Sequence, residues 1–298
     1  MENKRKNILL VIVSLFLILV VGVFFSLWNP TPPPVVKMPV PNGYTSFVEA
    51  EALVQKQTFD FATMDALQLR SLVDANSNAL QTTRVGLAEK SRVPVEFSQQ
   101  YISTHMTELG QMKLLAFAFL AEGRLAEMER RTNDAARAYF DLMRLGINSR
   151  EGGPLIDNLV GIAVEAMGTS PLQNLAPYLD AKTSAKLVHE FEIADSNRES
   201  WGQVLHNEKY WVRGVHPGPQ HLIAELFTSA KLKASDAKEK QRFETQQIKT
   251  RRLMLDLAAH AYQLDKGHRP TNAADLAPDY LKAVPIDPIT GKEMKMTP

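Results

Sequence analysis

Residues 132–145 read TNDAARAYFDLMRL, and this stretch decides the fold class. Its Thr-Asn-Asp opening supplies the side-chain oxygens that cap a helix N-terminus, and its apolar residues recur at helical spacing instead of alternating as in a strand. Gly146 is expected to end the helix. The residues from Pro94 to about Arg130 predict a long helix before it, so the two form a helical hairpin in an all-α fold.

The hairpin also has the size pattern of a known repeat. A turn followed by the small Ala136 and the bulky Phe140 resembles the second helix of a tetratricopeptide-type repeat. No second copy follows at a period of about 34 residues, so we expect helical-hairpin packing without a repeat array.

Further helices are expected on both sides of the hairpin, at 46–54, 64–88, 155–167, 171–179, 184–211 and 221–264. Ser46 and Glu49 predict a capping box for the first of these helices. The expected buried faces of the first two consist of Phe47, Ala50, Leu53, Val54, Leu67, Leu69, Leu72, Val73, Leu80 and Leu87.

The second half of the chain is expected to centre on the helix at 155–167. This segment is apolar almost all round, which predicts a central buried helix in which Gly161 allows close packing. Residues 214–219, GVHPGP, must break the chain. The last helix is either continuous or interrupted near 235–236, and Gly267 is expected to end it.

The N-terminus predicts a single membrane span at residues 8–28. Its core is free of charge, and about 20 residues at ~1.5 Å each cover the ~30 Å of a hydrocarbon layer. Lys4, Arg5 and Lys6 predict that residues 1–7 stay in the cytoplasm and that the rest is translocated. A cleaved signal peptide is the alternative, but the bulky residues that end the span leave no small-x-small site.

Residues 29–43, NPTPPPVVKMPVPNG, contain six prolines and are expected to form a semi-rigid linker. The alternative is a proline-rich ligand for a partner domain. An extracytoplasmic helical domain at 44–266 follows, and a short irregular tail at 267–298 is expected to pack on it through Leu276, Tyr280, Leu281, Val284 and Ile286.

Composition excludes several classes of function. The net charge of +1 gives no general attraction for nucleic acid, so no nucleic-acid partner is expected. The absence of cysteine excludes disulfides, thiolate chemistry and a lipidated cysteine. Signatures of serine hydrolases, nucleotide hydrolases and dinucleotide enzymes are missing, so neither an enzyme class nor a cofactor is indicated.

His206, Glu208, His216 and His221 are the candidate metal ligands, because zinc is bound by such nitrogen and oxygen donors. Their spacing matches no zinc pattern, and His206 and Glu208 are two residues apart, so on a helix they point in different directions and no metal site is expected. Residues 231–252 carry an excess of basic side chains, which suits either a solvated helix face or contact with anionic lipid or an acidic envelope polymer.

The tail from Tyr262 combines a helix end at Gly267, Pro270, the segment with Leu276 and Tyr280, and VPIDP at 284–288. In this order it resembles the tail of bacterial envelope proteins and of the major pseudopilins of type II secretion. The prepilin cleavage junction of that family is missing here. The remaining helices resemble those of uncharacterised bacterial membrane-anchored proteins, which implies an architecture but no activity.

Three functions follow as hypotheses. The first is a membrane-tethered, extracytoplasmic binding or scaffold module for a protein or envelope polymer, located in the bacterial cell membrane. The second is an envelope hydrolase with a site at 206–221, and the third is an accessory of a secretion apparatus.

Overall fold

The computed structural model describes residues 14–23, 37–55, 63–215 and 220–296. Within these ranges the chain is all-α, as predicted, and the only β pairing is an isolated bridge between Ile286 and Glu293. Residues 14–23 are helical. The remaining elements are α2 (Gly43–Leu53), α3 (Ala66–Ala75), α4 (Ser77–Leu87), α5 (Gln99–Met128), α6 (Thr132–Asn148), α7 (Leu155–Leu175), the short 3₁₀ turn η1 (Ala176–Tyr178), α8 (Ala181–Ser196), α9 (Trp201–Val215), α10 (Gln220–Lys266) and η2 (Ala273–Leu276).

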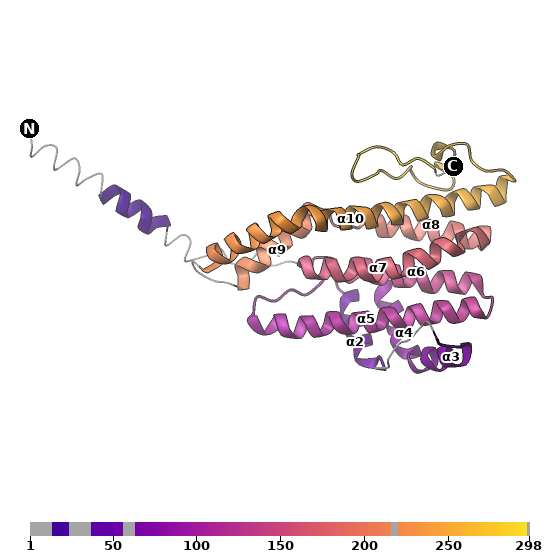
Figure 1. The fold of residues 1–298 in the computed structure, drawn as a ribbon, viewed down its shortest axis with the longest axis horizontal. Coiled ribbons are helices and arrows are strands. Elements are labelled where there is room, and N and C mark those ends of the chain that lie inside the picture. Colours follow the sequence, from indigo (N-terminus) through magenta and orange to yellow (C-terminus); the bar gives the residue numbers. More distant parts are fainter. Residues whose placement is uncertain (1–13, 24–36, 56–62, 216–219, 297–298) are drawn as a thin grey trace, which may run out of the picture.

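The long helices α5, α6, α7, α8 and α10 run along the same axis (Figure 1). Helices α2, α3 and α4 pack beside α5, and the tail after Gly267 runs back over α10. Within the described residues no helix is both long and apolar enough to cross a membrane. Of the expected span at 8–28, residues 14–23 are described and the others lie outside the described residues.

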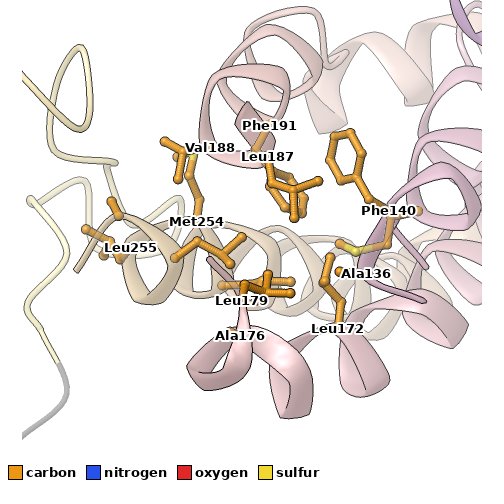
Figure 2. Packing of buried hydrophobic residues seen from close by; sticks show 14 of the residues in the cluster. Ala136, Phe140, Leu172, Ala176, Leu179, Leu187, Val188, Phe191, Met254 and Leu255 are labelled. Carbon is orange, nitrogen blue, oxygen red and sulfur yellow. The ribbon is translucent and has the colours of Figure 1, made fainter. Parts of the chain in front are cut away.

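Helix α6 is the central element, because its two sides enter different hydrophobic clusters. Tyr139, Phe140 and Met143 pack in a cluster with α8, α10 and the tail, whereas Leu142 and Leu145 pack in a cluster with α2, α4 and α5. Figure 2 shows the first cluster, in which the Phe140 and Phe191 rings meet edge to face at 4.5 Å. The predicted helix at 155–167 is part of α7, which packs against α5, α6, α9 and α10, but the prediction that its buried side chains are apolar was wrong.

Helix α7 instead turns polar and small residues toward the interior: Asp157, Asn158, Gly161, Glu165, Gly168 and Thr169 are all buried. Gly161 does allow close packing, as predicted, since a Cβ there would lie 2.4 Å from the Gly146 carbonyl oxygen. Gly146 thus lies inside α6 and does not end it. The glycines let two backbones touch where side chains would hold them apart.

Several predicted helix boundaries were wrong for local reasons. The expected helix at 64–88 is two helices, because Asn76 leaves the helical conformation and uses its side chain to bond Leu72 O and the N–H of Gln55. The expected helix at 184–211 divides into α8 and α9, and the buried Arg198 lies between them. Helix α7 continues through Pro171, where a separate helix had been expected.

At the ends of the domain the picture is mixed. Asn42, not Ser46, caps α2, and Leu53 and Leu67 are exposed although a buried position was expected. Helix α10 runs without interruption at 235–236 and ends at Gly267, whose φ of +75° is the left-handed conformation predicted for a terminating glycine.

The tail contributes to the core instead of extending away from it. Leu276 and Leu281 are buried in the cluster of α6, α8 and α10. The Lys282 N–H donates to Glu192 Oε1 at 2.6 Å, and Arg251 donates to the Ile286 carbonyl. Ile286 itself is 43% exposed, so its expected burial was wrong.

Candidate functional site

The structure does not bring the predicted histidine ligands together. Glu208 accepts the Leu155 N–H at 2.8 Å and so satisfies the first turn of α7. His206 is exposed and stacks on Tyr210. His216 and the side chain of His221 lie outside the described part. Among the described residues no three His, Asp or Glu side chains are placed to hold a metal ion.

A groove of about 1050 Å³ lies on the side of α6 and α8, and its volume is in the range of ligand-binding clefts. We call it the basic groove. Its walls come from the end of the linker, the end of α4 with the loop after it, α6 and α8. The lining residues are Lys37, Met38, Pro39, Val40, Arg84, Leu87, Ala88, Glu89, Lys90, Ser91, Arg92, Arg137, Arg144, Ile147, Asn148, Glu151, Glu190, Ile193, Ala194 and Asn197.

Backbone hydrogen bonds fix the loop that forms one rim of the groove. The Asn42 side chain donates to the Arg92 carbonyl at 2.8 Å and accepts the Arg92 N–H at 2.9 Å. The Gly43 N–H donates to Lys90 O, and the Val93 N–H donates to Glu151 O at 2.8 Å. Because these bonds join the linker end, the loop and the α6–α7 turn, the rim is preorganised.

Three arginines on the inner wall surround a buried carboxylate. Asp141 is 1% exposed, and Arg84 Nε lies 2.8 Å from its Oδ2. Arg137 Nε lies 3.4 Å from Asp141 Oδ1, and its Nη1 lies 2.7 Å from Glu190. Burial lowers the pKa of Arg144, because the free energy that its guanidinium loses on leaving water exceeds its attraction to the carboxylates of Asp141 and Glu190.

Glu151 is the titratable group where the groove adjoins the α6–α7 turn. Burial, with a smaller contribution from Glu199, raises its pKa to about 7, although Arg92 and Arg150 oppose the shift. The charge of the groove therefore becomes more positive as the pH falls through 7.

A second polar cluster, which the sequence did not reveal, lies between α2, α5 and α7. His105 Nε2 lies 2.8 Å from Asp157 Oδ1, and His105 Nδ1 lies 3.1 Å from Glu108 Oε2. Tyr101 stacks on the His105 ring with the centroids 4.7 Å apart. Because carboxylates hold both ring nitrogens, this histidine is placed as a buried ion-pair partner and not as a general base.

A third buried network joins α7 to α8 and α10. Glu165 is fully buried, and it accepts hydrogen bonds from Arg150 at 3.0 Å, Arg198 at 2.5 Å and the Thr250 hydroxyl at 2.5 Å. The two guanidinium groups lower the pKa of Glu165 in spite of its burial, so this carboxyl stays ionised. Such a network ties helices together, and its central carboxylate is fully engaged by Arg150, Arg198 and Thr250.

A search of protein-family models, curated proteins and solved structures finds no match for this chain. The fold and the groove define the class on their own: an all-helical domain with a preorganised, arginine-lined groove. The sequence contained a signal for the inner wall, because Arg137 and Arg144 flank Asp141 on one face of a predicted helix. It contained none for the other walls, which come from distant parts of the chain.

Proposed function

We propose that this chain is a membrane-tethered, extracytoplasmic binding module that holds a partner in the basic groove. The observation that carries the proposal is the groove itself, which combines about 1050 Å³ of volume with a hydrogen-bonded rim. Concave helical surfaces of this kind suit binding of extended partners. The described residues at 206–215 do not support the hydrolase hypothesis, because the Glu208 carboxylate accepts the Leu155 N–H at the N-terminus of α7.

The membrane tether rests on the sequence of residues 8–28 and on the basic residues before it. In the described part of this segment, side chains such as Leu15, Phe16 and Ile18 are more than half exposed, as lipid-facing side chains must be. The accessory role in secretion stays a prediction, since only the resemblance of the tail supports it.

Site-specific photocrosslinking tests the binding function. A photoreactive residue replaces Asn197, which lines the groove, or Tyr178, which is 75% exposed and does not line it. In cells that make the full chain, we expect one discrete adduct at Asn197 and none of that size at Tyr178. The substitution Ala88→Trp, which fills the groove from an exposed lining position, should abolish the adduct. Equal adducts at both positions, or an adduct unaffected by Ala88→Trp, would overturn the proposal.

A reporter that is active only outside the cytoplasm, fused after Pro298, tests the topology. We expect it to be active, because the cationic residues before the span retain the N-terminus in the cytoplasm. An inactive reporter beside an active cytoplasmic one would contradict this orientation.

A further inference from the structure

We infer that the occupant of the basic groove is an acidic polypeptide segment, in which carboxylate side chains are mixed with apolar ones. This inference rests on the proposed binding function and names the partner of the same groove. Three properties of the groove support it: the distribution of its charges, its apolar lining and its unpaired hydrogen-bonding groups.

The charges are unequal between the two walls. Among the lining residues six are cationic and three are acidic. On the inner wall Arg84, Arg137 and Arg144 lie within 4 Å of the buried Asp141, which offsets part of their charge. On the rim and linker side, no described residue forms an ion pair with the charged ends of Lys37, Lys90 or Arg92. The acidic lining residues on that side are Glu89 and Glu151, and the pKa of Glu151 is raised to about 7, so a ligand with carboxylates along the rim adds negative charge where the cations outnumber the anions.

The lining between these charges is apolar. Ile193 is 47% exposed and Val40 is 95% exposed, although both are aliphatic. Leu87 and Ile147 also line the groove but are only 2% and 3% exposed, so its accessible apolar surface comes from side chains such as Ile193 and Val40. A ligand carrying only charged groups would leave this surface in water, whereas apolar side chains next to carboxylates would cover it and gain about 25 cal/mol for each Å² buried.

Hydrogen-bonding groups complete the match to a polypeptide. The amides of Asn148 and Asn197 line the groove. No described residue forms a hydrogen bond with either side-chain amide. A side-chain amide both donates and accepts hydrogen bonds, so these two groups are suited to the backbone amides of a polypeptide occupant.

Other anions fit less well. The lining residues include no aromatic ring on which a sugar or a base could stack. A flat membrane surface would contact exposed basic side chains but would not reach into a groove whose inner arginines Arg84, Arg137 and Arg144 are only 35%, 37% and 19% exposed. An acidic polysaccharide and anionic lipid are therefore outcomes that the experiment must separate.

Binding of defined probes to the full chain in detergent micelles tests the inference. The first probe is a fluorescent peptide of alternating glutamate and leucine, followed by fluorescence anisotropy. We compare the wild type with Lys37→Glu/Lys90→Glu/Arg92→Glu and with the control Lys209→Glu/Lys249→Glu/Arg269→Glu, which changes three exposed residues outside the groove by the same total charge. Circular dichroism verifies that both variants fold.

Reversing the rim charges should weaken binding by at least about tenfold, and the control should change it by less than about twofold. A peptide with lysine in place of glutamate should bind at least about tenfold more weakly than the acidic peptide. If both peptides bind with equal affinity and Ala88→Trp abolishes the binding of both, the groove binds polypeptides. In that case only the inference that the occupant is acidic is wrong.

The remaining outcomes separate the other ligands. Tighter binding of a polyuronate, or of phosphatidylglycerol vesicles, than of the acidic peptide would overturn the peptide assignment. If no probe binds and the Asn197 crosslink also fails to form, the proposed function falls together with this inference. Equal loss of affinity in the rim variant and the control variant would show that binding reflects net charge and not the groove.

Discussion

The Nε2 atom of His105 lies 2.8 Å from Oδ1 of Asp157, and both side chains are almost completely buried. The two residues are 52 positions apart, so this contact joins α5 to α7 across the interior. The hydrogen bond and the charge of Asp157 raise the pKa of His105 against the opposing effect of burial. Burial in turn raises the pKa of Asp157, so the pair holds its proton tightly.

Replacing His105 by alanine should lower the free energy of unfolding by about 3–5 kcal/mol, because Asp157 would keep its burial and lose its partner. The control is His189→Ala on α8, where the side chain is exposed and the loss should stay within about 0.5 kcal/mol. Chemical denaturation followed by circular dichroism measures both. Equal stability of the two variants would contradict a structural role for the pair.

Glu51 should make stability depend on pH. Burial, with a contribution from the charge of Glu108, raises its pKa from 4.5 to about 8. A raised carboxyl pKa means that the folded state binds the proton more tightly, so stability should fall as the pH rises from about 4.5 to about 8. Glu51→Gln should flatten this slope and stabilise the protein by on the order of 2 kcal/mol above that window.

The matched control is Glu49→Gln on the same helix, where the side chain is exposed. It should leave the pH dependence of unfolding unchanged. A slope that persists in Glu51→Gln and vanishes in Glu49→Gln would reverse the assignment. The remaining slope should come from His105, Asp157 and the other buried carboxyls with raised pKa values, which are Glu151, Glu208 and Asp256, since each of these contributions weakens with rising pH.

The contact between α6 and α7 should tolerate no added methyl group. A Cβ at Gly161 would lie 2.4 Å from the Gly146 carbonyl oxygen, so Gly161→Ala must separate the helices and should cost about 1–3 kcal/mol. At Gly110 in α5 a Cβ meets nothing within 4 Å, so Gly110→Ala should stabilise the helix by about 0.5–1 kcal/mol. In thermal denaturation, Gly161→Ala should therefore lower the melting temperature and Gly110→Ala should raise it. Shifts of the same sign in both variants would refute the close contact.

The tail should contribute to the stability of the whole domain. Leu281→Ala removes a side chain that is 1% exposed in the cluster of α8 and α10, and should cost about 2–5 kcal/mol. Ile289→Ala, at a position that is 57% exposed, should cost less than about 0.5 kcal/mol. A melting temperature that is insensitive to Leu281→Ala would mean that the tail is not part of the folded unit in solution.

Local signals in the sequence predicted the elements that depend on neighbouring residues. Helical spacing predicted the all-α class, and Gly267 predicted the end of α10. The start of α6 at Thr132 was also predicted, but the capping by Thr132, Asn133 or Asp134 was wrong, because Arg131 is the N-cap residue and no side chain makes a capping hydrogen bond. Local signals failed at Asn76, where a hydrogen bond from the distant Gln55 N–H stabilises the break in the helix. They also failed at Pro171, where packing against neighbouring helices keeps α7 continuous.

The candidate sites depend on distant residues, and this is why the sequence suggested candidate ligands at 206–221 but did not reveal the basic groove. Asp157 and Glu165 sit in a segment that looks apolar all round, and only His105 and Arg198, which lie far away in sequence, explain why α7 buries them. In the same way, the rim of the groove exists because Asn42 bonds to Arg92, 50 positions further on. A single sequence contains no record of such pairings.

Because α6 contributes to two hydrophobic clusters, the two clusters can form only one after the other while the chain is being synthesised. The cluster with α2, α4 and α5 ends at Val164, so its residues are all available once about half of the chain has been made. The cluster on the other side includes Leu276, Leu281 and Met294, so it must wait until nearly the last residue has been added. During that interval the nascent chain exposes Phe140 and its apolar neighbours, and this is the period in which a chaperone would have the most to protect.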